Sequence, residues 1–486
     1  MSRRLPALLA AVVLPLGLAG AAVATDGPQF TEARFASVQP ATIPFVPKMG
    51  FLSATWFCGG APLPAAADGG RGGEVVIANP LDTPLEGTIT VFTDADGQAP
   101  VVQNVSVPPR DTLIVAVHEL QPQGTYVSSM VELGGAAGIV EQRAIHELGA
   151  AVSPCANSTS DTWYFADNYT LNDSSEDLVI TNPYPDDAIV DIKVATPTGT
   201  SADRPNLQGL AVPPQSILVI DEKYLPKEES TLAVGVVARN GRVVVAKAQQ
   251  YRTERVGYAF SLGAPSVSPQ WFFADGEKSD LVYFERYSIY NPGDREVTVT
   301  STVLGVPTDD PEFIPSREDV VGPGEVVSFL MNDWVALPSG RHRVEFSTAN
   351  DDGVVVERAI TRRAGDDGFV TSVSLGAPQA VGNYYRWSMA VGTELAVDGV
   401  LLVANLAGFD GTVTVKALGP GGEVPIPGLE AVSLPATGVL AIAIPDDAAA
   451  LGVPLIVEAD LPIIVERALP RSPDLRGRSA SLALPG

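Results

Sequence analysis

The chain has 486 residues and a formal net charge of −26, with 57 Asp and Glu against 31 Lys and Arg. This length predicts several domains of roughly 100–200 residues each. The negative charge, spread along the chain, disfavours nucleic acid as a partner and suits a soluble exported protein.

The N-terminus resembles a secretory signal peptide over residues 1–24. Arg3 and Arg4 precede an apolar run, and Ala22-Val23-Ala24 fits a small-x-small cleavage site. We expect cleavage after Ala24, with an uncleaved anchor as the alternative. No later stretch approaches the ~20 apolar residues of a membrane helix, so the expected location is secreted or cell envelope.

Residues 25–54 form a Pro-interrupted segment that we expect to be extended. It would serve either as a spacer from the membrane or as an extra strand.

One aromatic phrase then occurs three times at a fixed period. The copies are TWFCGG (55–60), TWYFAD (162–167) and QWFFAD (270–275), and the spacing is 107 residues from Trp56 to Trp163 and 108 from Trp163 to Trp271. A fixed period of this length predicts a tandem array of similar domains.

Four further landmarks follow each aromatic phrase in the same order. A strand ends at Asn-Pro, a second break follows about 30 residues later, a strand with a basic residue comes next, and a Leu-Gly-Ala phrase closes the unit. The Asn-Pro strands are VVIANP (75–80), LVITNP (178–183) and YSIYNP (287–292), and the second breaks are SVPPRDTLIV (106–115), AVPPQSILVI (211–220) and VGPGEVVSFL (321–330). The strands with a basic residue are GIVEQRAI (138–145), RVVVAKAQ (242–249) and GVVVERAI (353–360). The closing phrases are LGAAVSP (148–154), LGAPSVSP (262–269) and LGAPQAV (375–381).

A divergent fourth copy follows the same template. It contains YYRWS (384–388), LLVANL (401–406), SLPATGVLAI (433–442) and PIIVERAL (462–469). The predicted repeats are therefore residues 55–156, 157–269, 270–380 and 381–486.

Within each repeat, short alternating runs rich in Val, Ile and Thr are separated by Gly, Pro and Asp turns. This texture predicts an all-β fold of four tandem antiparallel β-sandwich repeats of about 107 residues. A β-propeller with two blades per repeat is the alternative, and the period favours the sandwich. The short linkers predict repeats that touch one another.

Cys58 and Cys155 are expected to form a disulfide, because the chain is expected to be exported and the two residues lie at the start and end of the first repeat. A loop of this length contributes about 4–5 kcal/mol to stability in the chain-entropy model.

The phrase W-Y-F-A-D, the Asn-Pro strand, the Val-Pro-Pro turn and Val-Glu-Arg-Ala together resemble a repeat of secreted actinobacterial proteins. That repeat usually begins W-Y-F-A-E-G. The chain from residue 55 onward is similar to an actinobacterial exported family of unknown function, and its domains to the sensory-rhodopsin-transducer superfamily of small β-sandwiches. The resemblance implies binding of small molecules such as sugars. It also implies assembly by fours, so we expect the four repeats to close into a pseudo-fourfold cluster, with a tandem row of repeats as the alternative. Lys247, with no Glu before it, departs from the usual pattern.

Signatures of catalysis are missing from the sequence. His118, His146 and His342 do not recur at matched positions and have no metal-ligand spacing, and no nucleophile elbow or zinc-binding helix occurs. We therefore expect no enzyme activity, no metal and no cofactor. A carboxylate pair for glycoside hydrolysis is set by space rather than by sequence, and a glycosidase-like enzyme is the least favoured reading.

Two sets of recurring residues are candidates for ligand binding. A Trp face could stack on a sugar ring while a nearby cation binds hydroxyl groups, and the alternative is a structural role in the core. The candidates are Trp163, Tyr164 and Trp271 among the aromatic residues, and Arg143, Lys247, Arg358 and Arg467 among the basic residues.

These features predict an exported, non-catalytic protein of the cell envelope that binds envelope carbohydrate or a related small ligand through its repeats. The second hypothesis is a structural or protein-interaction scaffold with no small ligand. The expected partners are cell-wall glycan or another envelope protein, with no membrane span after removal of the signal peptide.

Overall fold

Short β-strands make up nearly all the regular structure of the residues that the structure describes. In the strand β20 (Val297–Leu304), every second residue is buried, which is the period of a strand with one face on a core. The computed structural model describes residues 43–47, 52–64, 69–135, 137–197, 199–200, 205–221, 223–253, 255–306, 314–363, 369–390, 400–443, 453–470 and 478–486. The predicted signal peptide and most of the segment at 25–54 lie outside these residues.

Repeat 1 is a sandwich of two antiparallel sheets. One sheet has the order β1 (Ser53–Pro62), β6 (Tyr126–Gly134), β3 (Leu85–Thr93), β4 (Val101–Val107); the other has the order β5 (Thr112–Ala116), β2 (Gly70–Ala78), β7 (Ile139–His146), β8 (Gly149–Pro154). The short helix α2 (Val117–Leu120) follows β5.

Repeat 2 has the same plan. Its first sheet runs β12 (Gly199–Thr200), β11 (Ala188–Thr196), β15 (Leu232–Asn240), β9 (Thr162–Asn168), with β13 (Leu210–Val212) also paired to β11; its second runs β14 (Ser216–Ile220), β10 (Ser175–Asn182), β16 (Val244–Arg252), β17 (Val256–Leu262). A 3-10 turn, η1 (Pro205–Leu207), precedes β13.

Repeat 3 adds a short strand, β26, beside the first strand of its first sheet. The order is β21 (Ser316–Val321), β20, β23 (Gly340–Thr348), β18 (Gln270–Lys278), β26 (Ala377–Pro378), and the second sheet runs β22 (Val326–Leu330), β19 (Val282–Tyr290), β24 (Val355–Arg363), β25 (Phe369–Leu375). The 3-10 turns are η2 (Met331–Asp333) and η4 (Gln379–Val381).

Repeat 4 keeps both sheets despite its divergent sequence. The first runs β30 (Gly422–Pro425), β29 (Gly411–Gly419), β33 (Leu455–Ala459), β27 (Arg386–Met389), β36 (Leu484–Pro485), with β31 (Val432–Leu434) on β29; the second runs β32 (Val439–Ala443), β28 (Val400–Asn405), β34 (Ile463–Pro470), β35 (Arg478–Leu482). The prediction of antiparallel β-sandwich repeats is confirmed, and the propeller alternative is wrong.

An asparagine at the end of one strand joins the first two sequence breaks of each repeat. The Nδ2 of Asn79 donates to the carbonyl oxygens of Thr83 (2.8 Å) and Pro108 (3.0 Å), while its Oδ1 accepts the amide of Leu81 (2.9 Å). Equivalent bonds recur in the other repeats at Asn182, Asn291 and Asn405, except that Asn291 donates to Val321, one residue before the position equivalent to Pro108. The Asn-Pro step and the second break are therefore adjacent in space, and the Asn supplies the hydrogen bonds that hold them.

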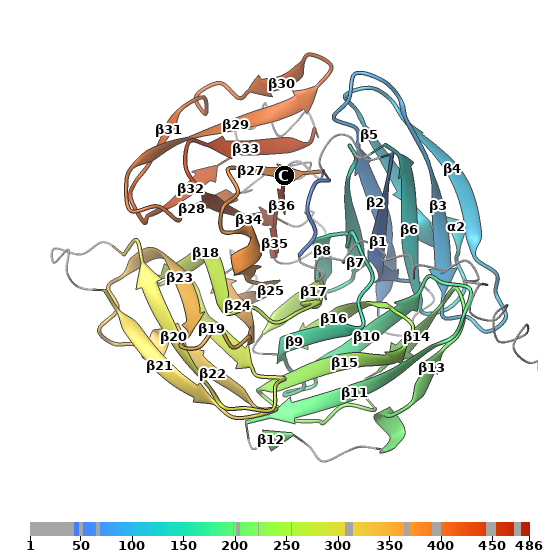
Figure 1. The fold of residues 1–486 in the computed structure, drawn as a ribbon, viewed down its shortest axis with the longest axis horizontal. Coiled ribbons are helices and arrows are strands. Elements are labelled where there is room, and N and C mark those ends of the chain that lie inside the picture. Colours follow the sequence, from blue (N-terminus) through green and yellow to red (C-terminus); the bar gives the residue numbers. More distant parts are fainter. Residues whose placement is uncertain are drawn as a thin grey trace, which may run out of the picture. The chain divides into compact units, whose positions relative to one another are not determined.

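The residues Ala41–Gly486 form one compact unit, in which the four sandwiches follow one another around a common axis (Figure 1). The last strand of each second sheet lies nearest this axis, and we call β8, β17, β25 and β35 the axial strands. Repeats 1 and 4, far apart in sequence, meet where the amide of Val152 donates to Ser479 Oγ (2.9 Å). The expected closed, pseudo-fourfold arrangement is confirmed by this contact and by the ion pairs described below.

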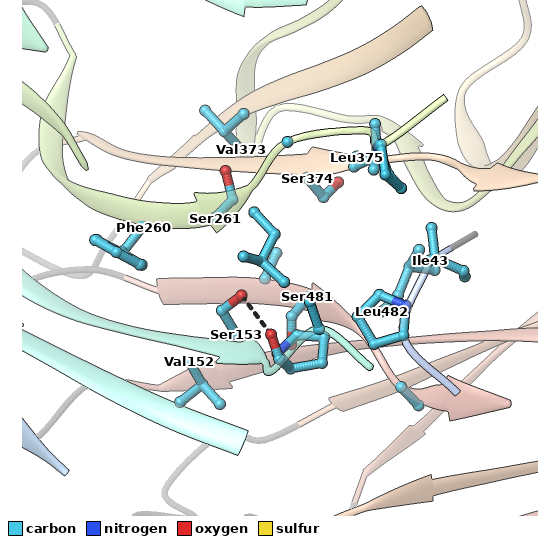
Figure 2. Close-up of a pocket in the computed structure, with 18 of the residues that line it drawn as sticks. Ile43, Val152, Ser153, Phe260, Ser261, Val373, Ser374, Leu375, Ser481 and Leu482 are labelled. Carbon is cyan, nitrogen blue, oxygen red and sulfur yellow. Dashed lines mark hydrogen bonds between the residues drawn. The ribbon is translucent and has the colours of Figure 1, made fainter. Parts of the chain in front are cut away.

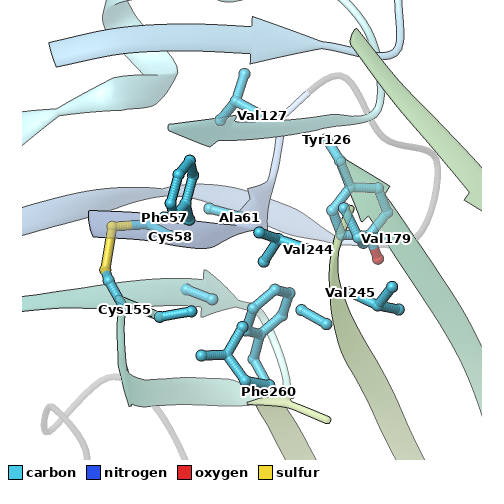
Figure 3. Close-up of a cluster of buried hydrophobic side chains, with 14 of the residues drawn as sticks. Phe57, Cys58, Ala61, Tyr126, Val127, Cys155, Val179, Val244, Val245 and Phe260 are labelled. Atoms are coloured by element: carbon cyan, nitrogen blue, oxygen red, sulfur yellow. A yellow bond between two sulfur atoms is a disulfide. The ribbon is translucent and has the colours of Figure 1, made fainter. Parts of the chain in front are cut away.

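The Cys58–Cys155 disulfide is present, with a Cα–Cα distance of 4.4 Å, which confirms the predicted pairing. It links the first strand of repeat 1 to the residue that follows β8, beside the apolar contact between repeats 1 and 2 (Figure 3).

The same position is filled by aromatic packing in the next two repeats. A Cβ atom on Gly263 would come within 2.8 Å of the Phe165 ring, and one on Gly376 within 2.7 Å of the Phe273 ring. In repeat 1 the disulfide thus takes the place of an aromatic ring packed against a glycine.

This equivalence corrects one landmark. The phrase Leu-Gly-Ala ends the axial strands of repeats 2 and 3, but in repeat 1 it lies at the beginning of β8. The residue equivalent to Gly263 and Gly376 is Cys155, as shown by the matching bridges of the following alanines, Phe57 to Ala156 and Tyr164 to Ala264.

Candidate functional site

The recurring tryptophans lie in the cores of the sandwiches. Trp56, Trp163, Trp271 and Trp387 are each at most 2% exposed. The indole Nε1 of Trp163 donates to the carbonyl oxygen of Val243 and that of Trp271 to Val354, both at 2.9 Å. Their burial leaves no exposed indole face on which a sugar ring could stack, and it agrees with the structural alternative.

Tyr164, the other aromatic candidate, contacts the next repeat. Its ring meets the ring of Tyr290 edge-on, with centroids 6.1 Å apart, and burial raises the pKa of its hydroxyl. Tyr164 therefore belongs to the boundary between repeats 2 and 3.

Three of the four candidate cations form ion pairs between repeats. The Nζ of Lys247 lies 3.1 Å from Glu357, and an Nη of Arg358 lies 2.7 Å from Glu466. Arg467 of repeat 4 pairs with Glu141 of repeat 1, which closes the circle. Each of these side chains is at most 1% exposed.

Two of the three glutamates in these pairs also accept backbone amides of the preceding repeat. Glu357 accepts the amide of Asp167 and Glu466 that of Ala274, both at 2.6 Å. A buried charge is tolerated when it is paired and hydrogen-bonded, and removing one partner of such a pair typically costs about 3–5 kcal/mol. The pairs therefore fix which surfaces of neighbouring repeats meet.

The boundary between repeats 1 and 2 has lost both charges of this pattern. Strand register places Gln142 opposite Ser153, as Lys247 lies opposite Ser261, so Gln142 and not Arg143 occupies the cation position. The same register places Ala246 at the glutamate position. The Oε1 of Gln142 accepts the amide of Gly60 at 3.0 Å, the role that a glutamate of the next repeat performs elsewhere.

Arg143 lies one residue beyond the cation position and pairs with Glu74 inside repeat 1, at 2.8 Å. Matching it to Lys247, Arg358 and Arg467 was wrong by one residue, because GIVEQRAI carries Gln between Glu and Arg where GVVVERAI does not.

Further buried charges gather at these boundaries. Arg362 contacts Asp275 at 2.6 Å, and Arg358 lies 3.7 Å from the same carboxylate. Desolvation raises the pKa of Asp275, but the charges of these arginines outweigh it and hold the pKa well below its usual value.

Glu176 is the most perturbed carboxyl group at the boundary of repeats 2 and 3. It is fully buried, and within the described residues neither oxygen has a hydrogen-bond partner. Desolvation raises its pKa to about 8, and nearby Lys247 offsets only part of that rise.

A cavity of about 60 Å³ lies between the four axial strands (Figure 2). Each strand contributes a serine at an equivalent position: Ser153, Ser261, Ser374 and Ser481. These serines lie opposite Gln142, Lys247, Arg358 and Arg467 in the strand register.

The serines were not recognised from the sequence, although all four stand two positions before the residue equivalent to Cys155. That signal is visible only when the fourth repeat and the correct end of β8 are aligned. Among the residues that the structure describes, no group of three or more His, Cys, Asp or Glu could hold a metal ion. No helix in this part of the chain is long and apolar enough to cross a membrane.

Comparisons with known proteins find similar proteins but do not identify a function for this chain. A model for a family of unknown function, DUF5719, matches residues 135–260, from β7 through most of β17. No curated protein matches the chain.

Among solved structures, Thermotoga maritima 1070 is 17% identical over 24% of this chain and 97% of that one, with a TM-score of 0.20. A tetra-tandem repeat from the extending region of a large adhesion protein is 14% identical over 83% of this chain and 92% of that one, with a TM-score of 0.11.

Proposed function

We propose that the protein is an exported, non-catalytic scaffold of the cell envelope, built as one closed ring of four sandwiches. The supporting observation is that the cations recurring in repeats 2, 3 and 4 lie buried between repeats. Lys247, Arg358 and Arg467 each pair with a glutamate of the next repeat in the circle. Side chains used in this way fix which surfaces of neighbouring repeats meet and are not accessible to a substrate.

The scaffold presents its loops and outer strands to a partner in the envelope, while the buried pairs hold the repeats in fixed positions. In-cell cross-linking tests this proposal, because a scaffold of this kind should capture an envelope partner only when the ring is intact. Arg467→Gln, which removes the ion pair between repeats 4 and 1, should abolish the cross-linked product. The control Arg239→Gln, which breaks an exposed pair with Asp191, should leave the product unchanged.

Two results contradict the scaffold proposal. One is a cross-linked product that stays unchanged with Arg467→Gln, although the unfolding transition shows that this variant has lost the contact between repeats 4 and 1. The other is release of new reducing ends from cell-wall polysaccharide by the purified protein, which would mark a hydrolase.

A second candidate function, carbohydrate binding, is favoured by an aromatic pair on repeat 3 whose tyrosine is exposed and whose phenylalanine is half-buried. The rings of Tyr283 and Phe369 lie 4.4 Å apart, Tyr283 is 52% exposed, and the Arg363 guanidinium lies 5.9 Å from the Phe369 ring. An exposed aromatic face beside a cation offers both stacking and hydrogen bonds to a sugar.

A glycan array separates the two candidates. Carbohydrate binding predicts retention that is lost with Tyr283→Ala and kept with Tyr385→Ala, a similarly exposed tyrosine of repeat 4. An array without any signal at millimolar glycan eliminates the second candidate and leaves the scaffold.

A further inference from the structure

The axial cavity is built from equivalent positions of all four repeats. Its walls come from three or four consecutive residues of each axial strand or its end, with Trp163 and with Ile43 and Pro44 of the N-terminal segment. That segment is held in place by the bonds from Phe45 to Asn157 Oδ1 (2.7 Å) and from Val46 to the carbonyl oxygen of Pro485 (2.8 Å).

Two of the four axial serines have no hydrogen-bond partner among the described residues. Ser153 Oγ donates to the carbonyl oxygen of Pro154 (3.2 Å), and Ser481 Oγ accepts from Arg467 Nε (3.0 Å). The Oγ atoms of Ser261 and Ser374 are buried and unpaired, and the whole Ser374 residue is only 4% exposed. Buried hydroxyl groups in native proteins are normally satisfied by protein, water or ligand.

The rest of the lining is apolar and carries no charge. Leu262, Leu375 and Leu482 follow the serines on their strands, and the other wall residues are Val, Phe, Ala, Gly, Pro, Ile and Trp, apart from Ser158. An anionic or cationic ligand would lose its hydration here without a counter-ion, so the lining excludes ionised ligands.

The size of the cavity decides between water and an organic ligand. A volume of 60 Å³ has room for about four or five water molecules, each of which needs two to four polar partners. Most of the lining is apolar, so that many waters would find few of the polar partners they need. A narrow aliphatic alcohol needs only one polar contact, whereas a sugar has too many hydroxyl groups for this lining.

We propose that the axial cavity binds a small neutral aliphatic alcohol, with its hydroxyl group bonded to Ser261 and Ser374 and its chain against the axial leucines. This inference does not depend on the scaffold function, because the cavity lies between the four axial strands whatever the outer surface binds.

Saturation-transfer NMR of the full chain with 1-butanol tests the site. Butanol should bind saturably at millimolar concentration, while n-butylammonium, of the same shape but charged, should show no saturable transfer. The double variant Ser261→Ala/Ser374→Ala should weaken butanol binding about tenfold, since it removes the hydrogen bonds to the ligand.

A filling variant separates this site from surface binding. Ala480→Phe places a ring in the cavity wall and should abolish the signal, and Ala431→Phe, an exposed alanine of the same repeat, should leave it unchanged. Equal signals from butanol and butylammonium, or butanol binding that survives Ala480→Phe in folded protein, would overturn the proposal. A crystal soaked in butanol that holds only water in the cavity would overturn it as well.

Discussion

At the residue scale, a left-handed backbone conformation recurs at the second break of each repeat. Arg110, Gln215 and Thr437 have φ values of 56°, 48° and 55°, and the equivalent Gly324 has 66°. Only glycine adopts this region without a steric cost, and a β-branched residue such as Thr is the least suited to it. Repeat 3 thus shows the residue that the turn favours.

Replacing Thr437 by Gly should therefore stabilise the protein. The relief of about 1–2 kcal/mol of left-handed strain exceeds the entropic cost of glycine, for a net gain of roughly 0.5–1 kcal/mol. The reverse change, Gly324→Thr, should destabilise it. Chemical denaturation of both variants checks the pair, and a loss of stability with Thr437→Gly would show that the turn is not strained.

A second residue-scale prediction concerns Glu176, whose pKa is raised to about 8 by burial from an ordinary value of 4.5. The folded protein then binds a proton that the unfolded chain releases above pH 4.5. The contribution of this group to stability is full below pH 4.5, is lost as pH rises toward 8, and is constant above that.

Glu176→Gln keeps the neutral form at every pH. The unfolding free energy of the natural protein should fall relative to that of Glu176→Gln between pH 4.5 and 8. Urea denaturation at several pH values measures the difference, with exposed Glu430→Gln as the control. A difference that does not change with pH would mean that Glu176 is ionised in the fold.

At the element scale, the sandwiches of repeats 1, 2 and 3 each have one contact between the first strand and the end of the axial strand. Repeats 2 and 3 use Phe165 on Gly263 and Phe273 on Gly376, and repeat 1 uses the Cys58–Cys155 disulfide. The two solutions occupy the same place in the same fold, so they should be exchangeable.

The double variant Cys58→Phe/Cys155→Gly tests this exchange. Replacing both cysteines by Ala should cost about 4–5 kcal/mol, because the disulfide closes a 97-residue separation. Phe and Gly should recover part of that loss through buried aromatic surface. Thermal unfolding should rank the natural protein first, the Phe/Gly variant second and the Ala/Ala variant last. A Phe/Gly variant no more stable than Ala/Ala would contradict the equivalence.

The elements also show what the sequence could and could not predict. The sandwich fold could be predicted from the period of the tryptophans and the alternating Val, Ile and Thr runs, since both report local geometry. These patterns could not predict the strand register, and Arg143 was aligned one residue away from the position that Gln142 holds. The partners of the cations were equally hidden, because Arg358 stands beside Glu357 in sequence but pairs with Glu466, 108 residues away.

At the scale of the whole molecule, the closed ring rests on one boundary that the chain does not connect. Repeats 1 and 2, 2 and 3, and 3 and 4 are joined by linkers, whereas repeats 4 and 1 meet only in space, through Arg467 and Glu141 and through Ser479 and Val152. The boundary of repeats 1 and 2, with Gln142 and Ala246, shows that the fold accepts an uncharged pair when both charges are absent together.

A double-mutant cycle on Arg467→Gln and Glu141→Ala tests the closed ring most directly, because these changes copy the natural uncharged boundary. Each single variant leaves one buried charge unpaired and should cost about 3–5 kcal/mol in unfolding free energy. The double variant should cost clearly less than the sum, with a coupling energy above about 1 kcal/mol, independent of protein concentration. Costs that add to within about 0.5 kcal/mol would show that residues 141 and 467 do not meet, and would contradict the ring.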